Sequence, residues 1–413
     1  MTLKSGHGLN QSESGPLHVP PANLNSVRTF AAVAVLLAAA VDARAQSGIA
    51  SLTTTLATES GGTYQTGTIS SGSSSATFAA TNNDLEVTSF TDATGHLYNY
   101  SASNPDNSTA AIVRRNTAAS GSGSDTDANE NGFSVWYASG SSSTSLKAAY
   151  NTNANNVLLG NNLYVGSDNL FVNNNGSSTP NQSNVERIDF EFGTTGTTGG
   201  QTTSSGISAT SSLALAVFDR GVVNAHDAFN IALIMGYDAN GNPIYTNSSI
   251  SGLKALSETS TSYGTTNPVA TFNYTLFRYD SGQGNNLNDN WNADSETASQ
   301  GVGGVVFTLS DFGITNAQIA SGLTIYGYSV MAADDTTTLA NLGGTNYQNS
   351  TYYPTATTDS SSDPGGIDLV GVNGEAFVVS AAPEPAFYGA VFAAIMVGWY
   401  LVWRRRQVTA PAA

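Results

Sequence analysis

An all-β fold, either a β-sandwich or a jelly-roll-like body, is predicted for the central part of this chain, with an apolar helix outside it at each end. Three observations predict this class. Short runs with period-two alternation fill residues 46–382, and helical periodicity is nearly absent from them. Turns rich in Gly, Ser and Asn separate the runs. No repeat of fixed period passes through them, which favours a sandwich over a propeller.

Among these runs, Arg187–Phe192 has the cleanest alternation. Its isoleucine and two phenylalanines face one side of the predicted strand, and Arg187, Asp189 and Glu191 face the other. Asp189 and Glu191 would then lie about 7 Å apart, as a pair of carboxylates. We interpret the charged side as a solvated strand face, on which the arginine screens the two acids.

The remaining elements follow the same pattern. In Leu213–Phe218 both alternate positions are apolar, which predicts a strand covered on both faces. An Asn-Gly pair within Asp238–Pro243 predicts a hairpin whose two central residues have positive φ. A division of the body into two subdomains, 46–184 and 185–382, is one interpretation of the sequence. Further strands are predicted at Leu85–Phe90, Phe133–Ala138, Leu163–Val165, Ala228–Tyr237, Ala270–Tyr279, Val305–Leu309, Leu323–Met331 and Ala376–Val379, and a short helix at Thr315–Ala320.

Composition narrows the function classes. The net charge of -17 would repel a phosphate backbone, so nucleic-acid binding is not expected. The chain contains 0 Cys, which excludes disulfides, thiolate metal sites and cysteine nucleophiles. Polar bulk comes instead from Ser, Thr, Asn and Gly. Together these features resemble those of secreted surface proteins of diderm bacteria.

The N-terminal region, residues 1–45, has the order of a signal peptide. Arg28 is followed closely by the apolar run Ala31–Val41 and then by Ala43-Arg44-Ala45, which has small residues at the two positions that signal peptidase reads. We therefore expect export, with cleavage before Gln46. A buried core helix is the alternative interpretation of the apolar run.

The C-terminal region contains three elements in order. Pro383-Glu384-Pro385 precedes the uncharged stretch Ala386–Trp403, and Arg404-Arg405-Arg406 follows at once. A helix over residues 386–403 would be about 27 Å long, which is enough for a hydrocarbon core. The arginines would stay cytoplasmic, together with the tail 407–413, so the body would face outward. The two prolines predict an extended, accessible tripeptide before the helix.

This arrangement resembles the PEP-CTERM sorting signal, the substrate of exosortases, over the region 383–406. The resemblance implies that an exosortase in the inner membrane cuts near Pro383, Glu384 and Pro385 and releases the body to the cell surface or the medium. The alternative is a simple C-terminal anchor, which needs only the apolar span and its flanking charges.

A calcium site is the one metal site that the sequence suggests. Asp127, Asn129 and Asn131, followed by Gly132, fit the first half of a calcium loop. The closing glutamate is missing, because the twelfth position is Ala138. We therefore expect an affinity of roughly 0.1–1 mM at best, as in extracellular modules, or an ordinary polar loop.

No catalytic motif is apparent in the sequence. A two-histidine zinc helix, a nucleophile elbow and a phosphate-binding loop are absent. His226 and Asp227 would point to opposite faces of a strand and could not pair there, so we interpret His226 as structural.

The leading hypothesis is therefore a non-enzymatic surface or matrix protein associated with exopolysaccharide or biofilm, with exosortase and signal peptidase as its partners during export. A carbohydrate-binding protein is a second hypothesis and a carboxylate-dependent glycoside hydrolase a third. Aromatic platforms for sugar stacking would come from Trp136-Tyr137, Trp291 and Tyr352-Tyr353, unless these side chains belong to the core.

Overall fold

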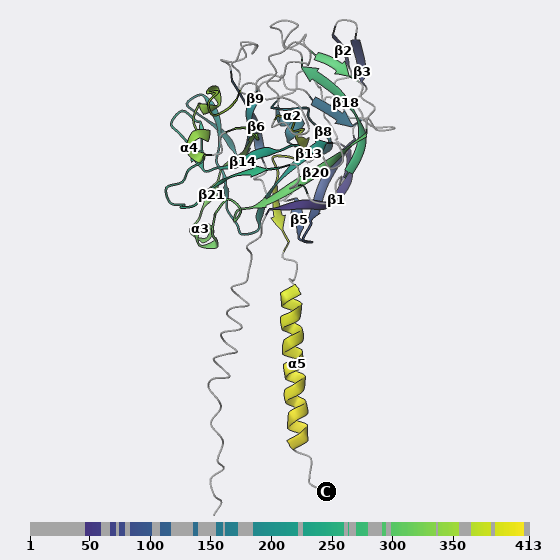
Figure 1. The fold of residues 1–413 in the computed structure, drawn as a ribbon, viewed down its shortest axis with the longest axis vertical. Coiled ribbons are helices and arrows are strands. Elements are labelled where there is room, and N and C mark those ends of the chain that lie inside the picture. The colour runs from purple at the N-terminus through teal and green to yellow at the C-terminus, as the bar shows by residue number, and fades with distance from the viewer. Residues whose placement is uncertain are drawn as a thin grey trace, which may run out of the picture. The chain divides into compact units, whose positions relative to one another are not determined.

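The computed structural model confirms an all-β body (Figure 1). Most of its elements are strands, and its few helices are short apart from one at the C-terminal end. The structure describes residues 46–58, 67–71, 74–78, 83–100, 108–116, 135–138, 154–159, 162–171, 185–221, 226–259, 263, 270–279, 291–294, 299–335, 338–354, 365–380 and 385–408. The signal-peptide region predicted at 1–45 and the calcium loop with Asp127, Asn129 and Asn131 lie outside these residues.

One 11-stranded sheet contains strands from the whole length of the body, in the order β1-β20-β13-β24-β5-β4-β8-β7-β18-β19, with β23 paired to β8. The strands are β1 (Ser47–Thr58), β4 (Asn83–Asp92), β5 (Leu97–Tyr100), β7 (Val135–Ala138), β8 (Asn162–Ser167), β13 (Leu213–Gly221), β18 (Ala270–Tyr279), β19 (Trp291–Asp294), β20 (Ser299–Thr308), β23 (Val370–Gly371) and β24 (Ala376–Val379). β1 also pairs with β4, so the first six strands of this order close into a ring.

A 5-stranded antiparallel sheet, in the order β17-β14-β22-β9-β6, is the second large sheet. Its strands are β6 (Ser108–Arg115), β9 (Val185–Phe192), β14 (Phe229–Ile234), β17 (Ala255–Glu258) and β22 (Gly327–Ala332). Since β6 and β9 pair across residue 185, and β1 pairs with β20, the proposed boundary between subdomains 46–184 and 185–382 does not coincide with a boundary between sheets.

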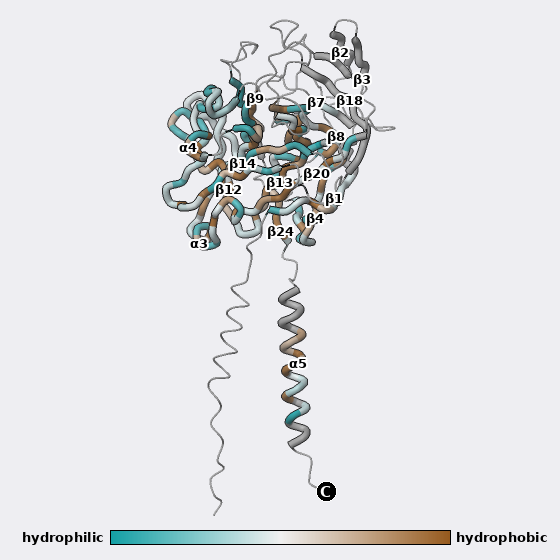
Figure 2. Tube along the Cα trace, in the orientation of Figure 1, coloured by the Kyte–Doolittle hydropathy of each residue, from teal (hydrophilic) through white to brown (hydrophobic). Residues whose placement is uncertain are grey.

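The main hydrophobic core lies between these two sheets. Ile188, Phe190 and Phe192 of β9 pack there with Leu215 and Val217 of β13. The other face of β13, with Ala214, Ala216 and Phe218, packs in a second core inside the ring. The prediction that β13 is covered on both faces is thus confirmed. Figure 2 shows hydrophobic residues gathered along β13, β20 and β14.

The outer face of the 5-stranded sheet is covered as well. A third cluster on this face combines Tyr245 and Met331 with Leu342 and Tyr353. The last two residues belong to the segment 338–354, which contains α4 (Leu339–Leu342) and η3 (Asn346–Gln348). We call this segment the cover. It removes from solvent a face that sequence alternation alone would leave exposed.

Small elements complete the described residues. They are the strand pairs β2 (Gly67–Ser71) with β3 (Ser74–Phe78), β10 (Thr195–Thr198) with β11 (Gln201–Ser204), β12 (Ile207–Ser208) with β21 (Thr324–Ile325) and β15 (Gly236–Tyr237) with β16 (Pro243–Ile244), and the helices α2 (Ala154–Leu158), α3 (Asn316–Ala320) and α5 (Pro385–Val408). The predicted helix at Thr315–Ala320 is confirmed as α3, whose capping residue Thr315 accepts a hydrogen bond from the Gln318 amide.

The predicted hairpin at Asp238–Pro243 forms, but its turn differs from the prediction. β15 and β16 pair across it, and Gly241 has φ +82° while Asn240 is not in the left-handed region. The Asp238 carboxylate accepts the backbone N–H groups of Asn240 and Asn242 at 2.8 and 2.9 Å. An aspartate that bonds to the backbone ahead of it therefore sets this turn, instead of two residues with positive φ.

Candidate functional site

The charged face of β9 is buried, contrary to the prediction of a solvated face. Arg187, Asp189 and Glu191 are each 0% exposed. The physical reason is the cover: the Arg187 guanidinium donates to the Leu342 carbonyl at 2.7 Å and to the Tyr353 hydroxyl at 3.2 Å. Among the described strands, no other strand face carries as many buried charged side chains. This face of β9 is therefore the candidate site.

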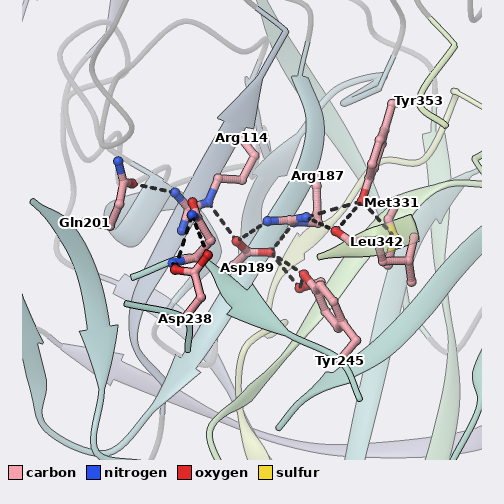
Figure 3. A network of polar contacts seen from close by, with 11 residues as sticks. Arg114, Arg187, Asp189, Gln201, Asp238, Tyr245, Met331, Leu342 and Tyr353 are labelled. Atoms are coloured by element: carbon pink, nitrogen blue, oxygen red, sulfur yellow. Dashed lines mark hydrogen bonds and ion pairs between the residues drawn. The ribbon is translucent and has the colours of Figure 1, made fainter. Parts of the chain in front are cut away.

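Asp189 is the centre of the site (Figure 3). Arg187, two residues earlier on β9, donates to its two carboxylate oxygens at 2.6 and 3.1 Å. Arg114 of β6 donates through Nε at 2.8 Å. The Ser329 hydroxyl of β22 donates at 2.6 Å and the Tyr245 hydroxyl at 3.3 Å. One carboxylate thus ties together three neighbouring strands.

The ionisation of Asp189 follows from this arrangement. Burial alone would raise its pKa, but Arg187 and Arg114 outweigh burial, so the pKa lies below its ordinary value. Burial is the largest single effect on the pKa of Arg187 and lowers it, but Asp189, Tyr245 and Tyr353 together outweigh burial, so the pKa is raised. The site therefore contains a permanent buried ion cluster, with two guanidinium groups on one carboxylate.

Tyrosines line the cationic side of the cluster. The Arg187 guanidinium lies 5.4 Å from the Tyr245 ring centroid and 5.5 Å from that of Tyr347. Arg114 donates to the Gln201 side chain at 2.7 Å. Sequence reasoning did not identify Arg114, Tyr245 or Ser329 as part of a site, since nothing in their own segments signals a partner on β9. The only local signal was a pair of arginines at the end of an apolar run in β6.

Glu191 differs from Asp189, although the two share one face of β9. Among the described residues, no hydrogen bond of good geometry reaches its carboxyl oxygens, and the Tyr237 hydroxyl is the polar neighbour that lowers its pKa slightly. Burial, followed by the negative charge of Asp189, raises its pKa to about 8, while Arg114 lowers it by a smaller amount. Glu191 is therefore protonated at neutral pH. The predicted carboxylate pair is real as a pair of neighbours, but only one member is ionised.

Replacing Glu191 by Gln should change how stability depends on pH. The folded protein holds the Glu191 proton up to a pKa of about 8, while an unfolded chain releases it near 4.5. The group therefore makes the protein less stable by about 1.4 kcal/mol for each pH unit between these values. Glu191→Gln removes that loss, so chemical denaturation should show a flatter profile and higher stability at pH 8.

Asp238→Asn provides the contrasting variant. Hydrogen bonds from Asn242 and the neighbouring backbone lower the pKa of Asp238, so its contribution is lost only in acid, below the ordinary range of aspartate. This variant should leave the slope between pH 5 and pH 8 as in the wild type. If Glu191→Gln also leaves that slope unchanged, Glu191 is not the buried neutral acid described above.

A second buried polar group surrounds Asp219 at the end of β13. Its Oδ2 atom lies 3.0 Å from His226 Nδ1 and accepts the Asp227 backbone N–H at 3.1 Å. The His226 ring is 0% exposed and stacks on Tyr263 at 4.7 Å. His226 precedes β14, and its partner is Asp219 and not the adjacent Asp227. Nε2 of His226 has no hydrogen-bond partner among the described residues, so none of their hydroxyl groups completes a catalytic triad with it.

Arg220 extends this second group toward the ring of strands. It donates to Asp168 at 2.9 Å and to Asp368 at 2.5 Å, and it also bonds to the side chain of Gln300. Its guanidinium lies 5.1 Å from the Trp136 ring centroid. Because these acids and Arg220 are all buried, we interpret the group as a link between strands from distant parts of the chain.

The proposed sugar-stacking platforms are only partly described. Trp136 and Tyr353 are each 0% exposed, so both belong to the core and cannot stack on a sugar in this structure. Tyr352 belongs to the cover and is half-buried. The side chains of Tyr137 and Trp291 lie outside the described residues.

The C-terminal sorting residues are described only from Pro385 onward. Pro385 is the first residue of α5, so the prediction that it belongs to an extended tripeptide is wrong at this position; proline fits the first helical turn, where its missing N–H is not needed. Arg404, Arg405 and Arg406 lie inside α5, and Arg404 is exposed. Pro383 and Glu384 lie outside the described residues.

Membrane and metal sites were also sought in the described residues. Among them, no helix combines the length with the apolar character that a membrane crossing needs. The same residues contain no group of three or more His, Asp or Glu side chains arranged to hold a metal ion. The calcium prediction at Asp127, Asn129 and Asn131 stays a prediction, because that loop is not described.

Comparison with known proteins gives no relative: no family model, no curated protein and no solved structure matches this chain.

Proposed function

We propose that this chain is an exported, non-enzymatic surface or extracellular-matrix protein, sorted by an exosortase and associated with exopolysaccharide or biofilm. One observation carries the proposal: Pro383-Glu384-Pro385, the uncharged stretch Ala386–Trp403 and Arg404-Arg405-Arg406 follow one another in this order. An anchor alone would not require the tripeptide, whereas a processing enzyme would need a sequence to recognise.

The unbroken helix α5 and its exposed apolar side chains support the proposal that the C-terminal region inserts into a membrane. The helix runs without a break from Pro385 to Val408. Phe392, Ile395 and Trp399 are 65%, 62% and 67% exposed. Exposed apolar area costs roughly 25 cal/mol per Å² in water. These side chains would therefore be more stable in an apolar environment. The proposal that the inner membrane supplies it rests on the full uncharged sequence, including residues whose side chains are not described.

The body supports a scaffold role. Its described ion clusters, around Asp189 and around Asp219, are buried and joined to several strands each, so they hold the sheets together and present no charged group to a substrate. A β-sandwich or jelly-roll-like architecture of the body is part of this proposal. Its sequence, rich in Ser, Thr and Asn and poor in Lys, suits contact with hydrated polysaccharide.

A pulse–chase experiment with cell fractionation tests the proposal. An antibody to the body should first detect a precursor in the inner membrane and later a smaller form in the extracellular fraction. Deleting the gene for an exosortase in the producing cell should keep the precursor in the membrane. A precursor that persists in the wild-type membrane and never shortens would support the simple anchor instead.

A further inference from the structure

The residue that follows the predicted cleavage site is fixed by the fold. Gln46 immediately precedes β1, and β1 pairs with β20 in a register that joins Ser47 to Val306 and Gly48 to Val305. Continued by one residue, this register places Gln46 opposite Phe307, near the end of β20. The backbone of Gln46 thus lies at the start of β1, beside the end of β20.

A carboxyl group lies near the backbone nitrogen of Gln46. The Gln46 backbone N–H faces the carboxyl group of Asp311, in the turn after β20, and lowers the pKa of that group slightly. The same carboxyl group accepts the Thr308 backbone N–H at 2.7 Å and the Thr308 hydroxyl at 2.9 Å, which fixes its position. Burial raises the pKa of Asp311, and Lys254 opposes this more weakly than burial does. The positive charge of Lys254 is therefore too weak to offset the effect of burial, and a further cation would stabilise the ionised carboxylate.

The side chain of Gln46 is held from the other sheet. Its amide nitrogen donates to the carboxylate of Glu258, the last residue of β17, at 2.8 Å. Glu258 is only 1% exposed, although Gln46 itself is exposed. The backbone N–H and the side-chain amide of Gln46 thus face two different acids, one in the turn after β20 and one at the end of β17. Among the described residues, Asp311 and Glu258 are the acids that face Gln46, and the charge of Lys254 acts on Asp311.

We propose that the N-terminus made by cleavage between Ala45 and Gln46 is a built site, in which the new α-ammonium group pairs with Asp311. The proposal rests on the export proposed above. Cleavage turns the backbone N–H that already faces Asp311 into a cationic amine at the same atom. Charge-assisted hydrogen bonds are about twice as strong as neutral ones, so cleavage itself stabilises the body.

The hydrogen bond from the Gln46 side-chain amide to Glu258 has a chemical consequence. A free N-terminal glutamine cyclises when its α-nitrogen attacks the side-chain amide carbon, forming the ring amide and releasing ammonia. Here the amide is held by Glu258 and the α-nitrogen, as ammonium, by Asp311, so neither is free to react. The mature N-terminus should therefore remain an open glutamine.

The test uses the chain from Gln46 to Ala413 in detergent, which is the form that the proposed cleavage leaves. The pKa of the α-amino group is measured from its rate of reaction with an amine reagent across pH. In wild type it should lie about one unit above the ordinary range of roughly 7.7–8.0, and Asp311→Asn should return it to that range. Equal values in both chains would overturn the proposal.

Acetylation of the α-amino group gives a second measurement that leaves Asp311 untouched. Acetylation should lower the melting temperature of the wild type by a few degrees and should not lower that of Asp311→Asn further. An equal drop in both chains would contradict the ion pair. Glu258→Gln should speed the loss of ammonia, seen by intact mass. A different N-terminus in the cell would refute the proposed cleavage site while leaving these results valid.

Discussion

Replacing Asp189 by Ala is expected to destabilise the body by about 3–5 kcal/mol, a large share of the roughly 5–15 kcal/mol that holds a typical domain folded. The variant leaves the Arg187 and Arg114 guanidinium groups buried, with exposures of 0% and 1%, and without their carboxylate. The two arginines are also direct register partners on β9 and β6, so their charges repel. Urea denaturation at neutral pH would measure the loss.

A double-mutant cycle separates the ion pair from the volume of the side chain. Asp189→Asn keeps the shape and removes the charge, and Arg114→Gln removes one partner. The two changes together should cost less than the sum of their separate costs, with a coupling of about 0.5–3 kcal/mol. Asp238→Asn keeps an oxygen that can accept the backbone N–H groups of its turn, so it is the matched control and should cost less than Asp189→Asn. Additive costs for the Asp189 and Arg114 changes would show that the two groups do not interact.

Replacing Glu384 by Ala is expected to block processing almost completely. Glu384 lies before the uncharged stretch Ala386–Trp403, so its loss should leave insertion of that stretch unchanged. The proposed exosortase, however, would lose the acidic residue of its recognition tripeptide. Fractionation should then find full-length precursor in the inner membrane and almost no extracellular body.

Neutral replacements of Arg404, Arg405 and Arg406 are the matched comparison for the tail. They should weaken the signal that stops translocation and fixes the orientation of the helix, because positive residues hold the flanking segment in the cytoplasm. The body should still react with the antibody, but its side of the membrane should become mixed. If Glu384→Ala is processed and released like wild type, the segment is only an anchor.

Strand positions could be predicted well where the alternation is strong. The predicted bounds Ala270–Tyr279 and Ala376–Val379 are those of β18 and β24. The two apolar faces of Leu213–Phe218 correctly indicated burial on both sides, because each face packs in a different core. Period-two alternation reports which side chains share a face, and this information is local.

The environment of a polar face could not be predicted, because it depends on distant segments. The charged face of β9 is indistinguishable from a solvated face in sequence, yet the cover, whose Leu342 lies 155 residues beyond Arg187, buries it. Arg114 reaches the same carboxylate from 75 residues before it. The same holds for His226, whose partner is Asp219 and not its neighbour in sequence. Local patterns gave the residues of the candidate site on β9, but tertiary packing sets their ionisation.

The most direct test of the central claim is mass spectrometry of both ends of the extracellular protein. We expect an N-terminus at Gln46 and a C-terminus near Pro383-Glu384-Pro385, with the uncharged stretch Ala386–Trp403 removed. An extracellular form that still contains residues 386–413, or that still carries Arg28 to Val41, would contradict the account.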